Sequence, residues 1–399
     1  PGTIARPRLL RLLAAEPGPP VISVIAPAGY GKTTLLAQWA ARERRPVAWL
    51  TLGDLDNDPA VLLTYLAVAL DRIAPVDSSI RTAIAAPRER VLATAVPRLA
   101  SELARHAPVV LVLDDVHRIV DRTALDALAA LIDHLPDGVR VVIAGRTEAD
   151  LPIARLRAQR DLLEIDQGQL ALDEPEATAL AAAAGDALSP AEVHTLVARA
   201  EGWAAGIYLA ILARGQGPGE PGPGSTVSGR DRYIAAYLRA EIERDLADDD
   251  VAFLTRTAIL EAITPAVADV LTGQAGSEER IRALARGNLL IQEIDGPEPT
   301  FRYHNLLREF LLGELERREP GAAPDLHRRA SAWFLAAGNA DLAVEHALAS
   351  GDADAAARLV TALALPTFYG GRPATLDRWL RQLDARILER HPPLAVIAG

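Results

Sequence analysis

A glycine-containing loop between a β-branched run and an apolar helical pattern constrains this chain more than any other stretch. The run Val21–Ile25 is typical of a buried strand, the loop reads Ala26-Pro-Ala-Gly-Tyr-Gly-Lys-Thr-Thr34, and a helical pattern continues from Leu35. In such an arrangement successive backbone N–H groups turn inward, and the positive end of the new helix points at the same hollow. The spacing therefore predicts a phosphate-binding loop in an α/β domain.

Four residues of this loop have expected roles. Gly29 and Gly31 let the backbone approach phosphate oxygens with no Cβ in the way. Lys32 can reach the β- and γ-phosphates, and the Thr33 hydroxyl is placed to bind Mg²⁺. Lys32 is also the only lysine in the chain, so the one compact ammonium lies where a point charge on a flexible stem is useful. The residues expected to bind the nucleotide are Pro27, Ala28, Gly29, Tyr30, Gly31, Lys32, Thr33 and Thr34.

One position departs from the usual pattern, which opens with glycine where this chain has Ala26. A small side chain is tolerable there because the residue ends the strand and does not line the deepest part of the loop. The alternative interpretation is a glycine-rich turn that binds nothing. The strand before the loop and the helix after it favour the phosphate-binding interpretation.

Length and composition limit the classes of protein that fit. The 399 residues are too many for one hydrophobic core, so two to four domains are expected. The net charge of −11 argues against nucleic-acid binding by this chain alone, and the absence of cysteine excludes disulfides and thiolate metal sites. No apolar run approaches the ~20 residues of a membrane span, and no signal-peptide pattern opens the chain. We expect a cytoplasmic protein and, since the chain lacks methionine and begins at Pro1, a piece or processed product of a longer one.

Strand-like runs alternate with helical patterns in the first part of the chain. After Val21–Ile25, further strands are expected at residues 46–52, 109–115, 139–146 and 162–166. The alternation predicts a mainly parallel sheet with right-handed crossovers. Ligands of such sheets bind beyond the carboxyl ends of the strands, where Lys32, Asp114, Asp115 and Arg146 would meet in one cleft.

The pattern then becomes helical and rich in alanine. Residues 173–212 form a helical region that is interrupted at Gly185, at Ser189-Pro190 and by the segment Glu201-Gly-Trp-Ala-Ala-Gly206. Residues 215–224 are almost entirely glycine and proline, which cannot pack or join a strand ladder. They indicate a mobile surface tether.

The rest of the chain contains two further kinds of pattern. In residues 232–318, four helical patterns precede two strand-like runs around a Gly-Pro turn, and a final helix follows, which predicts a winged-helix domain. Its helix at Ser277–Arg286 mixes charges, so we do not expect it to read DNA. From Asp325 onward, short apolar helical stripes are separated by tight turns, as in stacked helical repeats. We expect this array to continue beyond residue 399.

Taken together, these segments make the chain similar to the signal-transduction ATPases with numerous domains (STAND). Within that class it resembles the large ATP-binding regulators of the LuxR family. The resemblance covers nearly the whole chain in the same order. The matching stretches are residues 26–34, 47–52 with 56–59, 111–117, 151–157, 201–206, 301–304 and 326–334.

The resemblance implies a multidomain fold of the α/β plus α class. The expected parts are a P-loop NTPase (ATPase) domain with a parallel sheet (1–170), a small helical domain (171–213), a flexible Gly/Pro linker (214–231), a winged-helix domain (232–318) and the start of a TPR-like helical repeat array (319–399). Such regulators bind DNA through a further C-terminal domain that these residues do not include. That organisation agrees with the acidic balance of the chain.

The resemblance also implies a switch that uses ATP, ADP and Mg²⁺. ADP would hold the protein closed, and an inducer or regulatory protein on the repeats would favour exchange for ATP. The ATP form would self-associate to activate transcription, and slow hydrolysis would reset it. The switch requires that ATP and ADP have different affinities for the two forms. No membrane partner is expected.

Individual roles follow for the acidic pair and for Arg146. We expect Asp114 to hold Mg²⁺ with Thr33, and Asp115 to orient or deprotonate the attacking water, although adjacent acids could also cap the next turn. Arg146 resembles the arginine that senses the γ-phosphate, the alternative being a solvated charge. Lys32, Asp115 and Arg146 are therefore the expected catalytic residues.

Three other positions are singled out by the resemblance. His304 matches the histidine that touches the β-phosphate of ADP in relatives, with a simple helix cap as the alternative. His117 is expected to support the acidic pair by hydrogen bonding. Ala204 departs from the family, which often has proline there in an element that touches the nucleotide.

Two other functions remain open from the sequence. A P-loop kinase for small molecules would need an arginine-bearing lid and an acceptor pocket, and it would leave the winged-helix pattern and the repeats unexplained. A scaffold that keeps ADP as a structural ligand without hydrolysing ATP has the same sequence features as a slow ATPase.

Overall fold

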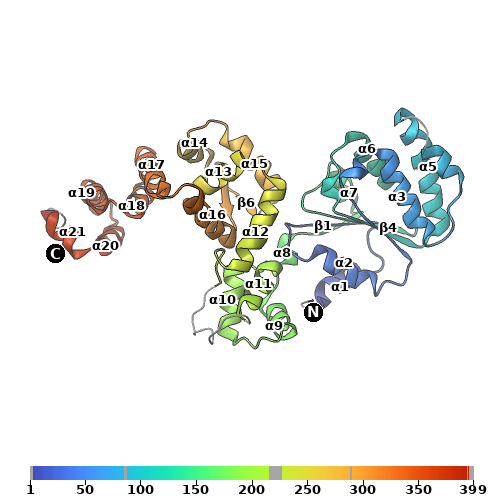
Figure 1. Cartoon of the computed structure of the whole chain (residues 1–399), viewed down its shortest axis with the longest axis horizontal. Coiled ribbons are helices and arrows are strands. Elements are labelled where there is room, and N and C mark those ends of the chain that lie inside the picture. The colour runs from blue at the N-terminus through green and yellow to red at the C-terminus, as the bar shows by residue number, and fades with distance from the viewer. Residues whose placement is uncertain (1–2, 85–87, 215–226, 288–289, 393, 395–399) are drawn as a thin grey trace. The chain divides into compact units, whose positions relative to one another are not determined.

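The computed structural model describes residues 3–84, 88–214, 227–287, 290–392 and 394 (Figure 1). Its contacts divide the chain into two compact units, Pro1–Val227 with Arg286–Leu289 and Ser228–Ala285 with Leu290–Gly399. We refer to them as the first and the second unit. Residues 215–226 of the expected linker, and residue 289 of the expected wing, lie outside the described residues. The finer division into five segments stays a prediction.

Five parallel strands form the sheet of the first unit. They are β1 (Val21–Ile25), β2 (Val47–Thr51), β3 (Val109–Asp114), β4 (Val139–Gly145) and β5 (Leu162–Ile165), and their spatial order is β2-β3-β4-β1-β5. Every residue of β3 and β4 is buried, as expected for central strands covered on both faces. The predicted parallel α/β sheet is confirmed, and all five strands end at the same edge.

Helices cover both faces of this sheet (Figure 1). One face carries α1 (Pro7–Leu13) and α2 (Lys32–Ala40), and the other carries α3 (Pro59–Asp71), α5 (Arg88–His106) and α6 (Arg122–Asp133). The larger apolar core lies on the second face, where leucines of the three helices pack on the strands, among them Leu62, Leu66, Leu99 and Leu128. Two short 3₁₀ turns, η1 (Asp54–Asn57) and η2 (Val116–Arg118), follow β2 and β3, and α7 (Ile153–Gln159) precedes β5.

One short helix on this face was not predicted. Helix α4 (Ser79–Ile84) packs on α3 and α5 and buries Ile80, Ala83 and Ile84. Six residues give fewer than two turns of periodicity, so this helix depends on its tertiary contacts and not on a local pattern.

A small helical bundle completes the first unit. It contains α8 (Gln167–Leu170), α9 (Glu174–Ala183), α10 (Pro190–Ala200) and α11 (Ala204–Arg214). Three of the four helices begin with a capping box. In this motif the side chain of the N-cap residue accepts the backbone N–H of the third helical residue, whose own side chain accepts the backbone N–H of the N-cap residue. The N-cap residues are Asp166, Asp173 and Ser189.

The second unit begins with four helices, a two-stranded hairpin and a fifth helix. They are α12 (Arg232–Asp245), α13 (Asp248–Thr257), α14 (Pro265–Thr272), α15 (Ser277–Arg286), β6 (Ile291–Ile294), β7 (Thr300–Tyr303) and α16 (Asn305–Arg318). Strands β6 and β7 pair antiparallel, and Phe301 also bridges to Ile263 ahead of α14. The guanidinium of Arg308 on α16 donates to the carbonyl oxygens of Ala258 and Leu260, at 2.9 and 3.0 Å, which fixes α16 against the end of α13. The winged-helix architecture is confirmed.

Consecutive helices then pack in series. They are α17 (Ala322–Ala336), α18 (Ala340–Ala349), α19 (Ala353–Tyr369), α20 (Pro373–Arg381) and α21 (Ala385–Arg390). Helices α17, α18 and α19 each contact the next, and α21 packs on α19. Gly338 and Gly351 make the turns with φ of 77° and 76°, and Asn339 and Asp352 then cap the following helices. This arrangement is that of stacked helical repeats. None of the described helices is long and apolar enough to span a bilayer.

Candidate nucleotide-binding site

The phosphate loop runs from the end of β1 at Ile25 to the start of α2 at Lys32. Gly29 and Gly31 have φ of 81° and 80°, in the left-handed region that residues with a Cβ rarely adopt. Gly31 is also the N-cap residue of α2. The two glycines therefore let the chain turn sharply and direct the N-terminus of α2 at the loop.

Lys32 is buried at the base of this loop and is only 7% exposed. Its Nζ donates to the carbonyl oxygens of Ala26 and Pro27, at 2.7 and 3.0 Å. Ala26 is itself fully buried, and its N–H bonds the carbonyl oxygen of Gly145 on β4. A methyl group therefore fits at the position where the usual pattern has glycine.

Thr33 and Asp114 meet at the carboxyl end of β3. The Thr33 Oγ1 donates to Asp114 Oδ2 at 2.9 Å, and the Asp114 side chain is buried with 2% of its residue surface exposed. Burial raises the pKa of the Asp114 carboxyl, and the nearby charge of Asp115 raises it further, while the hydrogen bond from Thr33 opposes the shift. The folded chain thus brings together the two residues expected to hold Mg²⁺.

The chemistry of these two oxygens fits a magnesium ion. Thr33 Oγ1 and Asp114 Oδ2 lie at one point, 2.9 Å apart. A hydroxyl and a carboxylate are also the hard oxygen donors that Mg²⁺ prefers. Thr33 and Asp114 can hold the ion once the hydroxyl hydrogen turns away.

Asp115 adopts a backbone conformation that turns its carboxylate toward solvent. Its φ is 59°, its N–H donates to Asp114 Oδ1 at 3.1 Å, and its side chain is 41% exposed. One carboxylate of the pair is therefore held in the protein, and the other is accessible to a water molecule.

His117 does not support the acidic pair in the expected way. Its Nδ1 lies 3.8 Å from Asp115 Oδ1, which is too long for a hydrogen bond, and this nitrogen has no hydrogen-bond partner among the described residues. Burial lowers the pKa of His117 to about 4, with the charges of Arg146 and Lys32 acting in the same direction and that of Asp115 against it. The imidazole is neutral at pH 7, and the charges of Arg146, Lys32 and Asp115 all act on it.

The helical bundle of the first unit contacts the phosphate loop directly. The indole N–H of Trp203 donates to the carbonyl oxygen of Ala28 at 2.9 Å, and the N–H of Ala205 donates to that of Gly29 at 2.9 Å. Both donors belong to the segment 201–206, which the sequence identified by resemblance only. The sequence directed attention to Ala204 and missed Trp203, although a tryptophan between small residues was the available signal.

A cavity of about 240 Å³ adjoins this contact. Its walls come from the N-terminal segment 3–6, from Gly29–Gly31 of the loop, from Thr34 and Gln38 on α2, and from Ala204 and Ala205 on α11. The N-terminal segment is fixed there because the buried Arg6 forms an ion pair with Glu176 at 2.8 Å. Ala204 thus lines a hollow beside the phosphate loop.

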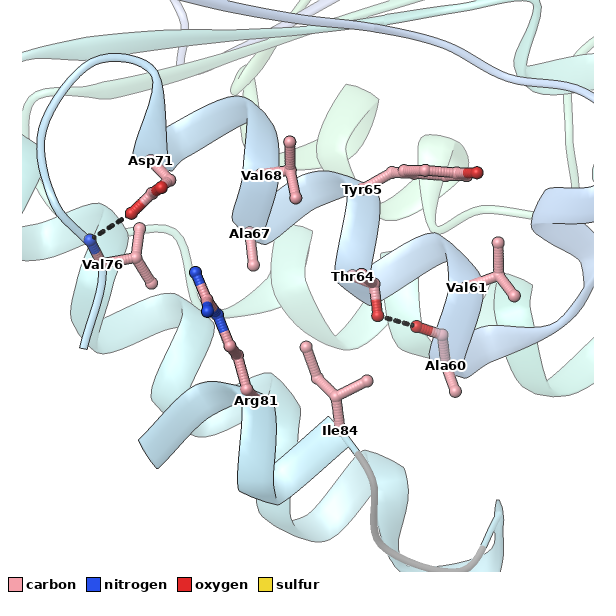
Figure 2. A pocket seen from close by; sticks show the side chains of 10 residues that line it. All are labelled: Ala60, Val61, Thr64, Tyr65, Ala67, Val68, Asp71, Val76, Arg81 and Ile84. Carbon is pink, nitrogen blue, oxygen red and sulfur yellow. Dashed lines mark hydrogen bonds between the residues drawn. The ribbon is translucent and has the colours of Figure 1, made fainter. Parts of the chain in front are cut away.

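A larger hollow elsewhere in the first unit has a different character. Figure 2 shows this cavity of about 550 Å³ between α3 and α4, lined mainly by apolar side chains such as Val61, Tyr65 and Ile84. Arg81 and Asp71 are its charged residues, and the Asp71 carboxylate accepts the N–H of Val76. None of the phosphate-loop residues lines it, so the geometry gives it no part in phosphate binding.

His304 belongs to the second unit and serves there as a helix cap. Its Nδ1 accepts the N–H of Leu306 at 3.2 Å, its own N–H donates to the carbonyl oxygen of Leu290, and it is 1% exposed. The structure thus shows the capping role that the sequence left as the alternative. The contact of His304 with ADP stays a prediction.

Comparison with known proteins gives matches in both units. Residues 6–144 match the AAA ATPase domain family, and residues 239–323 match the MalT winged helix domain family. The chain is 30% identical over 400 residues to the HTH-type transcriptional regulator MalT of Vibrio parahaemolyticus, which covers 99% of this chain and 44% of that protein. It is 31% identical over 363 residues to the serine/threonine-protein kinase PknK of Mycobacterium tuberculosis, which covers 90% of this chain and 33% of that protein.

A solved structure supports the fold. A Walker-type ATPase of Pyrococcus abyssi is similar with a TM-score of 0.54 and 13% identity, over 77% of this chain and 96% of that one. The chain spans less than half the length of the curated relatives it matches.

Proposed function

This chain belongs with the MalT-like ATPase regulators, since it carries their AAA ATPase domain and their winged-helix domain, and on that premise we propose that it is an ATP- and ADP-dependent switch of a transcriptional regulator. The observation that carries the proposal is the cluster at the phosphate loop. There a buried ammonium and a hydroxyl at the junction of β1 and α2 lie beside a buried carboxylate at the end of β3. These are the groups that a magnesium-bound polyphosphate requires.

Lys32 and the backbone of the loop bind the phosphates in this proposal. Lys32 exchanges its two carbonyl partners, which are neutral, for phosphate oxygens, which are anionic and accept stronger charge-assisted hydrogen bonds. The positive end of α2 adds to the attraction. The cavity beside Ala204 and Gln38 takes the nucleoside, because it opens next to the loop residues Gly29–Gly31.

Asp115 and Arg146 act in hydrolysis. Thr33 and Asp114 would hold Mg²⁺, which would neutralise charge on the β- and γ-phosphates. Asp115 has an exposed carboxylate and orients or deprotonates the attacking water. Arg146 stabilises the charge that develops on the γ-phosphate. Hydrolysis by this set is slow and resets the switch.

The regulatory part of the proposal uses the two nucleotide states. ADP favours a closed form through the His304 imidazole, and ATP favours an open form that self-associates. An inducer or regulatory protein on the helical repeats shifts the balance toward ATP. Support comes from the MalT relative, whose name describes a transcriptional regulator, while PknK is named a protein kinase. DNA contact requires a domain other than those described here.

Two measurements on one pair of variants test this function. Isothermal titration of the protein with ADP and with ATP, both with Mg²⁺, should show binding that Lys32→Ala weakens at least tenfold. The matched control is Arg42→Ala, which removes an exposed positive charge just after the same helix, where the guanidinium donates to the carbonyl oxygen of Gln38. Absence of binding by the unaltered protein would refute the proposal.

The same pair separates the switch from a scaffold that keeps ADP without hydrolysing ATP. Phosphate release from ATP should occur in the unaltered protein and in Arg42→Ala, and should stop in Lys32→Ala. A scaffold would bind ADP and release no phosphate in any of the three. A phosphorylated small molecule recovered from a mixture of candidate acceptors would instead indicate a kinase.

A further inference from the structure

The helical bundle holds two peptide groups of the phosphate loop by their carbonyl oxygens. Trp203 Nε1 donates to Ala28 and the N–H of Ala205 donates to Gly29, each at 2.9 Å. The two residues that donate are more than 170 positions away in the chain. The loop is therefore held at two of its carbonyl groups by an element outside the sheet.

Peptide geometry makes these bonds relevant to anion binding. In a planar trans peptide the C=O of one residue and the N–H of the next point in opposite directions. Holding the carbonyls of Ala28 and Gly29 on the bundle side therefore directs the N–H groups of Gly29 and Tyr30 to the other side, into the hollow of the loop. The Gly29 N–H donates to none of the described residues, as expected for a group that serves a ligand.

The contact is close and leaves the loop little freedom. A Cβ on residue 29 would lie 2.6 Å from Trp203 Nε1 and 2.6 Å from the Ala205 Cβ. The indole is fully buried, so water cannot take its place at the Ala28 carbonyl. A rotation of the loop peptides would break both bonds and take the Ala28 carbonyl away from the buried indole N–H, which is costly.

The turn before Trp203 positions the indole. Glu201 and Gly202 both have positive φ, at 47° and 70°, and they end α10. The carbonyl oxygen of Gly202 accepts the N–H of Leu172, and a Cβ at Gly202 would meet the Ala171 Cβ at 2.7 Å. Trp203 is thus anchored to the bundle independently of the loop.

We propose that Trp203 is a positioning residue that keeps the phosphate loop in its anion-binding conformation and links phosphate occupancy to the helical bundle. The inference rests on the proposed function, since it assumes that the loop binds a nucleotide. Trp203 lies outside the loop and outside the acidic pair, and it acts through the Gly29 and Tyr30 N–H groups. A movement of these peptides around a bound phosphate therefore displaces the indole and, through it, α10 and α11.

The variant Trp203→Phe tests this role, because it keeps an aromatic ring and removes the N–H donor. Losing one neutral hydrogen bond should weaken ADP binding about threefold to tenfold. Adenosine has no phosphate, so its affinity should change less than twofold. Trp39→Phe is a matched control, since Trp39 is another buried tryptophan of the first unit and its Nε1 has no hydrogen-bond partner among the described residues.

A second variant removes the other donor. Ala205→Pro deletes the N–H that bonds Gly29 but no intrahelical hydrogen bond, because residue 205 lies in the first turn of α11. Inorganic pyrophosphate is the probe here, since it does not use the cavity that Ala205 lines. Its affinity should also fall about threefold to tenfold.

The outcomes separate this inference from the function on which it rests. Equal ADP affinity in Trp203→Phe and Trp39→Phe would overturn the positioning role while leaving nucleotide binding intact. An equal loss for ADP and adenosine would also overturn it, because a general structural defect does not distinguish phosphate from nucleoside. If the unaltered protein bound neither ADP nor pyrophosphate, the proposed function would fail and the inference with it.

Discussion

Replacing Thr33 with valine removes one hydroxyl from the centre of the site and keeps the size of the side chain. In the structure this hydroxyl is the donor to Asp114 Oδ2 at 2.9 Å. Asp114 is buried, so the carboxylate oxygen loses its partner and water does not readily replace it. We therefore expect Thr33→Val to destabilise the folded protein even without nucleotide.

The size of the effect follows from the kind of bond that is lost. A hydrogen bond to a charged group contributes about 1.5–3 kcal/mol net. Because the pKa of Asp114 is already raised by burial, the variant shifts the carboxyl further toward its neutral form. The loss in the free energy of unfolding should thus be about 2 kcal/mol at pH 7, and it should shrink as the pH falls and Asp114 takes up its proton.

Urea unfolding of the protein measures this loss, and Thr34→Val is its control. Thr34 is the next residue on α2, is exposed, and makes no hydrogen bond with the described residues through its hydroxyl, so the change should cost less than about 0.5 kcal/mol. A double-mutant cycle with Asp114→Asn should give a coupling energy of about 1 kcal/mol or more. Equal midpoints for the two valine variants, or no coupling, would refute the reasoning.

Three further predictions test other parts of the account. Asp115→Asn should keep ATP affinity and lower phosphate release by about 10²–10⁴-fold, because it removes a general base and no phosphate ligand; unchanged release would remove this role from Asp115. Gly202→Ala should lower the free energy of unfolding by about 2–4 kcal/mol, because residue 202 has a φ of 70° and a Cβ there would meet Ala171. Gly185 has a φ of 84° but nothing within 4 Å of a Cβ, so Gly185→Ala should cost only about 1–2 kcal/mol. Burial, and then the charges of His327 and Arg308, lower the pKa of His346 to about 4. Between pH 6.5 and 4 the unfolded chain therefore binds more protons at this residue than the folded chain does. The free energy of unfolding should fall by roughly 2–4 kcal/mol as the pH drops through this range. His346→Gln should remove this contribution and leave that of His117, whose pKa is lowered in the same way; an equal change in a variant of the exposed His194 would contradict the assignment.

Local patterns were sufficient for most elements of the fold. The continuous apolar run of β3 and the β-branched residues of β1 predict buried strands, and both lie where expected. Pro59 after Asp58 predicts a helix start, which the side chain of Asp58 caps. These features depend on interactions within a few residues, which a sequence displays directly.

Contacts between distant segments could not be predicted in this way. Nothing local indicates that Trp203 donates to Ala28, or that Arg6 pairs with Glu176, because each bond depends on how two folded elements meet. The expected hydrogen bond of His117 was wrong for a related reason. Proximity in sequence to Asp115 did not give the imidazole the right distance, since Asp115 turns away at a positive φ.

The central claim is that the phosphate loop binds a nucleotide at Lys32, and the single lysine of the chain allows a direct measurement. An acyl-phosphate derivative of ATP transfers its acyl group to an amine that lies beside the bound phosphates, and mass spectrometry locates the modified residue. The account predicts acylation of Lys32 that excess ATP or ADP suppresses. Unmodified Lys32, or modification that neither nucleotide reduces, would contradict it.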